Sequence, residues 1–172
     1  MASAMNRFWK LIDKSRLDVD EGDVESQLER LQDLLEEWEP EEIVGFHRCF
    51  TEAVRNAYRW DLWGAAYLIN DGCDEAGFDD FLGWLIAQGR DYYLAALDDP
   101  QKAGDRIEEE YEHECEAMWS VAAKAYEART GRRDFYVIAP DVSLTPQGQE
   151  WAVRDLAYLF PRLARRFGRR DR

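Results

Sequence analysis

Residues 24–38 read VESQLERLQDLLEEW, and their apolar side chains recur in steps of three and four. This spacing places one apolar stripe along a helix and leaves the glutamates on the outer face. Asp23 directly precedes the stripe, and a short carboxylate in that position caps a helix. The stretch predicts an amphipathic helix. Because similar stripes recur along the chain, an all-α fold follows.

The 172 residues are enough to bury one core without disulfides, and no linker divides them. We expect a single domain, residues 1–172, folded as a compact bundle of six to eight helices. The three cysteines are far apart and form no C-x-x-C pair, so reduced thiols packed as small hydrophobes are expected. They are Cys49, Cys73 and Cys115.

The second half of the chain is less regular. Residues 103–128 predict one long helix whose first half is crowded with glutamates. Residues 132–144 contain the only strand-like run, and because one strand cannot form a sheet, an extended segment lying on the helices is expected. A last helix is predicted to start near residue 145, and Pro161 would kink or divide that helix. Residues 168–172 are expected to form a frayed basic tail.

The charge is large and uneven. The net charge is −14, yet residues 152–172 hold seven arginines and only two aspartates. The rest of the chain therefore carries 15 basic and 34 acidic residues. A body this acidic repels nucleic-acid phosphates and anionic membranes, which leaves basic proteins or cations as predicted partners. The alternative is that the acidity only keeps an aromatic-rich protein soluble.

Nothing in the sequence indicates a membrane protein. No apolar run approaches the roughly 18 residues of a membrane span. The N-terminus lacks the apolar block of a secretory signal. The expected location is therefore the cytoplasm.

The densest group of aromatic and small residues is AYRWDLWGAAYLIN, residues 57–70. This stretch resembles the central motif of the uncharacterised bacterial family DUF4240. The other similar motifs are F-W-x-x-I at residues 8–12, G-C at 72–73, F-x-x-F-x-x-W-L-I-x-x-G-R at 78–90 and A-Y-E-x-x-T-G at 125–131. The resemblance covers roughly residues 6–131. It implies an all-helical fold and no particular activity, since none is assigned to the family.

The chain departs from the family pattern at two places. Where the family usually has Ser-Asp-Asp after Gly-Cys, this chain has Asp74-Glu75-Ala76. Where the family commonly has arginine after the second Phe, this chain has Leu82. If the family shares an arginine-dependent site there, the resemblance implies that this protein has altered or lost it.

Acidic and aromatic side chains of the motif region form the densest candidate ligand site. Its members are Trp60, Asp61, Trp63, Asp74, Asp79, Asp80, Trp84 and Arg90. A cleft with carboxylates beside aromatic walls could bind a cationic or sugar-like ligand, or a divalent metal. The alternative needs no ligand: the aspartates cap helices, the tryptophans fill the core, and Arg90 pairs with a carboxylate.

Motifs for catalysis are missing. The chain has no G-x-S-x-G elbow, phosphate-binding glycine loop or dinucleotide fingerprint. His47 lies beside an apolar helix face. Glu109 and His113 have the four-residue spacing of a metal pair but lack the H-E-x-x-H pattern. The sequence predicts no metal site and no cofactor, and leans against an enzyme.

Three functions remain open. The leading interpretation is a non-enzymatic binding or interaction module whose acidic, aromatic-lined surface binds a basic protein. The second is a small-ligand or metal-binding protein, or an enzyme, with a site around Trp60-Asp61-Trp63 and Arg90. The third is nucleic-acid binding through the arginines after Pro161, which could instead fold back onto the acidic body.

Overall fold

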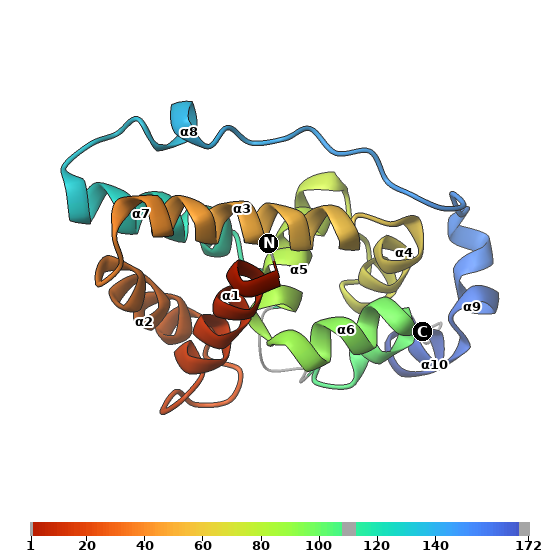
Figure 1. Ribbon diagram of the computed structural model, residues 1–172. Helices are drawn as coiled ribbons and strands as arrows, with labels where there is room; N and C mark the ends of the chain where they lie inside the picture. Colours follow the sequence, from red (N-terminus) through yellow and green to blue (C-terminus); the bar gives the residue numbers. More distant parts are fainter. Residues whose placement is uncertain (1, 108–112, 169–172) are drawn as a thin grey trace.

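The structure, a computed structural model, describes residues 2–107 and 113–168. That part of the chain contains helices and no strand, which confirms the predicted all-α fold (Figure 1). The α-helices are α1 (Ala2–Ser15), α2 (Val24–Glu36), α3 (Pro40–Ala57), α4 (Trp60–Ile69), α5 (Glu75–Ala87), α6 (Arg90–Asp98), α7 (Ala117–Thr130), α8 (Phe135–Ile138), α9 (Leu156–Leu159) and α10 (Pro161–Phe167). Two 3-10 helices, η1 (Pro100–Gly104) and η2 (Val153–Asp155), complete the described elements.

Local interactions explain where the first helices begin. Asp23 accepts a hydrogen bond from the Ser26 N–H at 3.0 Å and caps α2, as its position predicts. Pro40 occupies the first turn of α3, where its missing N–H has no cost. Asp74 caps α5 by accepting from the Gly77 N–H at 2.9 Å.

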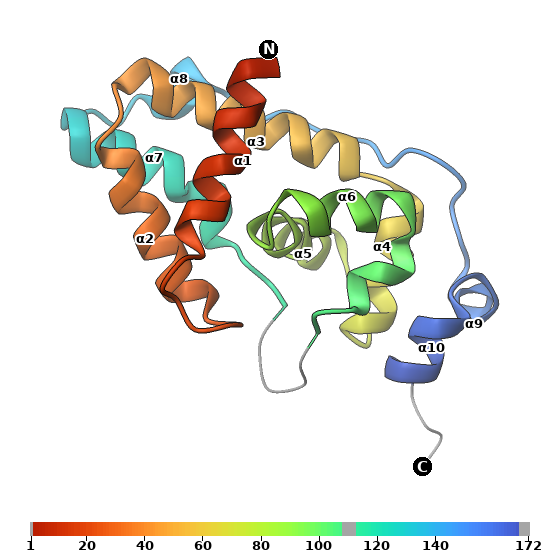
Figure 2. The same ribbon diagram turned by 60° about the horizontal axis from the view of Figure 1, so that its bottom comes forward.

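The helices surround one main core. α7 packs against α2 and α3, and α1 lies against the same two helices. α5 lies in the middle, in contact with α3 and α7 on one side and with α4 and α6 on the other (Figure 2). The largest fully buried side chains come from α1 to α5 and include Phe8, Leu31, Phe50, Phe78 and Phe81.

The C-terminal helices form a second, smaller cluster. After α8 an extended segment, here called the strap (residues 139–152), runs alongside α3 to the far end of the molecule (Figure 1). There Leu156, Phe160 and Leu163 pack on Ala65 of α4. The strap is held at its end by backbone pairing of Gln147 with the α3–α4 junction. α9 and α10 are thus anchored about 20 residues beyond α8.

Two expectations for the second half were wrong. The long helix over residues 103–128 does not form, because η1 ends at Gly104 and the described residues 105–107 and 113–116 are not helical. The Cys115 N–H donates instead to the Asp80 carbonyl at 2.9 Å, and closely spaced glutamates repel each other in a helix. The last helix begins well after residue 145, since Gln147 pairs with another part of the chain.

Other expectations for this region hold in part. Pro161 divides the last helical region into α9 and α10, as predicted. Segment 132–144 is extended except for the single turn α8, where Phe135 packs on Tyr126 and His47. These short pieces bring the described helices above the expected six to eight. Residues 169–172 of the predicted frayed tail lie outside the described part of the chain.

Two further features are the state of the cysteines and the length of the helices. All three cysteines are free, but only Cys115 is buried, whereas Cys49 and Cys73 are partly exposed. None of the helices in residues 2–107 and 113–168 combines the length and apolar character needed to cross a bilayer.

Replacement by alanine should have opposite effects on stability at two glycines of the structure. A Cβ at Gly83 would lie 2.4 Å from the Cys115 carbonyl oxygen, whereas a Cβ at Gly45, inside α3, would meet nothing within 4 Å. We expect Gly83→Ala to lower the free energy of unfolding by about 1–3 kcal/mol through overpacking. Gly45→Ala should raise it by roughly 0.5–1 kcal/mol through helix propensity. Urea denaturation of both variants measures this, and equal effects would contradict it.

Candidate functional site

Three aromatic rings stack where α4 meets α5. Trp60 and Trp63 are nearly parallel, with centroids 5.1 Å apart. Trp63 and Phe78 are also nearly parallel, at 5.0 Å. The Trp63 indole N–H donates to the Cys73 carbonyl at 2.9 Å, which fixes the turn before α5. Both faces of the Trp63 ring are therefore covered by other rings.

Four carboxylates follow this stack on the turn and first helical turns of α5. They are Asp74, Glu75, Asp79 and Asp80, and with Cys73 they form what we call the acidic face. Among the described residues none of the four has an ion-pair partner. The Tyr58 hydroxyl donates to Glu75 at 3.4 Å.

Electrostatic strain is concentrated at Asp79. Partial burial, with repulsion from Glu75 and Asp80, raises the pKa of this carboxyl to about 6. Burial, followed by repulsion from Glu116 and Asp74, raises the pKa of Asp80. The same surroundings raise the pKa of the Cys73 thiol to about 12, again with burial as the main cause. The acidic face is thus a region of negative potential without a paired cation among residues 2–107 and 113–168.

The other members of the predicted site lie elsewhere. Asp61 forms an ion pair with Arg59, whose Nε lies 2.9 Å from Oδ1, beside a cavity of about 550 Å³ at the end of the strap. Trp84 is buried in the core. Arg90 is exposed and donates to the amide oxygen of Asn6 on α1 at 3.3 Å, not to a carboxylate. The predicted group is therefore divided between four places: the stack with the acidic face, the Asp61 cavity, the core and the contact with α1.

Glu75 belongs to the acidic face and Tyr58 contacts it, although neither was among the predicted site residues. Glu75 lies four residues before Asp79, so both project from the same side of α5. Once Asp74 is assigned as the cap of this helix, the sequence itself predicts that Glu75 and Asp79 share one side of it. The Tyr58 contact joins the residue after α3 to the first residue of α5, 17 positions apart, and no local spacing indicates it.

The carboxylates do not form a metal cage. In the part of the chain that the structure describes, no group of three or more His, Cys, Asp or Glu side chains is placed to hold a metal ion. Glu109, half of the Glu109–His113 spacing, lies outside the described residues.

A family model described as "Protein of unknown function (DUF4240)" matches residues 4–128. The chain belongs to this family. No curated protein matches the sequence, and no solved structure does so either. The DUF4240 match includes nearly all of α1 to α7 and the acidic face, but ends before the strap. Leu82, where the family commonly has arginine, is fully buried in this member.

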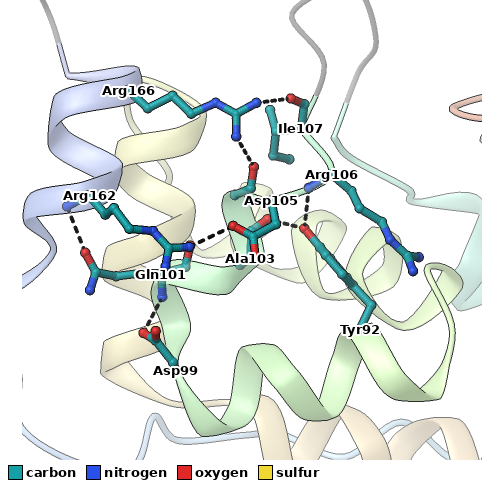
Figure 3. A network of polar contacts seen from close by, with 10 residues as sticks. Tyr92, Asp99, Gln101, Ala103, Asp105, Arg106, Ile107, Arg162 and Arg166 are labelled. Carbon is teal, nitrogen blue, oxygen red and sulfur yellow. Dashed lines mark hydrogen bonds and ion pairs between the residues drawn. The ribbon is translucent and has the colours of Figure 1, made fainter.

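Two of the C-terminal arginines of this DUF4240 member, Arg162 and Arg166, contact its own body (Figure 3). Arg162 forms an ion pair with Asp105, with Nη2 2.7 Å from Oδ1. Arg166 donates to the carbonyls of Gly104 at 2.8 Å and Ile107 at 2.6 Å. These contacts hold α10 against η1. They engage two of the arginines with which a nucleic acid would have to pair.

The raised pKa of Asp79 predicts a pH-dependent gain in stability for Asp79→Asn. The folded protein keeps this proton up to about pH 6, so ionisation of Asp79 opposes folding as the pH rises. We expect Asp79→Asn to be more stable than wild type at pH 7 by about 1 kcal/mol, allowing for solvent screening. The difference should vanish below the ordinary carboxyl pKa, near pH 3.

Thermal unfolding at pH 3, 5 and 7 measures this difference. Asp33→Asn, at an exposed position on α2, is the control. A constant difference across the three pH values would contradict the assignment.

Proposed function

We propose that this protein is a binding module that recognises a basic protein partner through the acidic face. The observation that carries the proposal is Asp79, a half-buried carboxylate held among other carboxylates with its pKa near 6. A group that opposes the stability of its own fold marks a functional position. An arriving arginine or lysine would relieve the repulsion and stabilise the ionised form.

The aromatic stack supports this surface indirectly. Both ring faces of Trp63 are covered, by Trp60 and by Phe78, so a cation cannot approach them. The stack instead fixes α4 against α5 and holds the acidic face in one shape. We infer that recognition uses carboxylate–guanidinium or carboxylate–ammonium contacts, which are strongest when bidentate.

The other interpretations have less support. A single ligand site containing Asp61 and Arg90 is disfavoured, because Asp61 pairs with Arg59 and Arg90 contacts α1. Nucleic-acid binding through the C-terminus competes with the contacts of Arg162 and Arg166. The three free thiols favour a reducing compartment, so we place the interaction in the cytoplasm.

Removal of charge from the acidic face should weaken binding to a basic probe far more than the same removal elsewhere. The probe is a fluorescent deca-arginine peptide, and the variant is Asp79→Asn with Asp80→Asn. We expect its dissociation constant to rise by about tenfold, as for loss of a desolvated charge contact. The control, Glu29→Gln with Asp33→Asn on α2, loses the same charge and should change affinity by roughly twofold or less.

Fluorescence anisotropy at several salt concentrations measures both affinities. Binding to the wild type should also strengthen from pH 5 to pH 7, as Asp79 ionises. If the two double variants lose affinity equally, binding depends on total charge and the acidic face is not the site.

A further inference from the structure

A second candidate site lies under the strap and is independent of the acidic face. An open cavity of about 1070 Å³ is lined by the first turns of α1, one face of α3 and the start of the strap. Its volume is slightly above the roughly 300–1,000 Å³ range common for small-molecule sites. Apolar atoms dominate its walls, with Met5 from α1 and Ile138 and Val142 from the segment above.

A buried histidine without a hydrogen-bond partner lines this cavity. His47 is only 3% exposed, and its Nε2 makes no hydrogen bond among the described residues. The closest carboxylate oxygen, Asp141 Oδ1 of the strap, is 3.6 Å away, beyond hydrogen-bonding distance. Because buried polar atoms in folded proteins are normally paired, this nitrogen is a group to which a ligand in the cavity could form a hydrogen bond.

Two cations stand beside the apolar walls. Arg48 and Arg55 line the cavity two turns apart on α3. Arg55 pairs with Glu52 at 2.8 Å, while Arg48 makes neither a hydrogen bond nor an ion pair with any residue that the structure describes. In a protein with a net charge of −14, an unpaired arginine beside an apolar cavity favours an anionic ligand group.

Helix α3, which forms the floor of the cavity, has unfilled space beside one of its residues. Gly45 lies within α3 and lines the cavity, and a Cβ there would meet nothing within 4 Å. Glycine inside a helix weakens it, and here no neighbouring side chain requires the space. The open space lets an apolar group approach the α3 backbone closely.

We propose that this cavity binds a small amphipathic carboxylate. Its apolar body would lie along Gly45, Met5 and Val142, a polar atom would bond to His47, and its carboxylate would pair with Arg48. The floor of the cavity lies within the DUF4240 match at residues 4–128, while its roof, residues 138–142, lies beyond it. The strap therefore adds a cover to a surface of the family domain.

Decanoate is the probe, and 1-decanol, which has the same chain without the charge, is its neutral counterpart. Isothermal titration calorimetry of the full chain should show decanoate binding, with decanol at least about fivefold weaker because it lacks the charge-assisted pair. Arg48→Gln should remove that difference. Arg154→Gln, an exposed arginine of η2 outside the cavity, should leave it unchanged.

Filling the cavity separates binding at this site from binding elsewhere. Gly45→Leu places a side chain in open space, so the protein should stay folded while decanoate affinity falls by about tenfold or more. His47→Gln tests the polar contact, and the two other variants remain informative if it fails to fold. No decanoate binding at millimolar concentration, or equal affinity in wild type and Gly45→Leu, would overturn the proposal.

Discussion

The contact between α5 and the chain just before α7 constrains most of the structure. The Cys115 N–H donates to the Asp80 carbonyl at 2.9 Å, and Gly83 leaves room for the Cys115 carbonyl to lie against α5. The Trp119 indole N–H adds a bond to the Asp79 carbonyl at 3.0 Å. Together these contacts set the start of α7 and hold α5 at the centre of the bundle. They also bind the backbone of the segment whose carboxylates form the acidic face.

Some charged side chains hold helices together, whereas others have no partner of opposite charge among the described residues. Arg162 and Arg166 are consumed in holding α10 against η1, partly through backbone carbonyls. Glu75 and Asp79, by contrast, have no cation opposite them within the described residues, and their mutual repulsion contributes to the raised pKa of Asp79. The carboxylates of the acidic face therefore take no part in the ion pairs that the described residues form.

The acidic face and the strap cavity share one physical feature. Each contains a group that the folded chain leaves unsatisfied: the crowded carboxylate of Asp79 in one, and the buried Nε2 of His47 in the other. They are built from different elements, α5 for the first and α1, α3 and the strap for the second.

The sequence by itself determined the all-α fold, the caps of α2 and α5 and the start of α3, because these depend on residues three or four positions apart. It also identified Asp74, Asp79 and Asp80, which are close in the chain and in space. Only the tertiary structure decided the start of α7, the path of the strap and the separation of Arg90 from the acidic residues. Each of these depends on contacts between distant segments, such as Asp80 with Cys115, or Gln147 with the α3–α4 junction. Helical periodicity describes the faces of single helices, so it cannot indicate which of those faces meet.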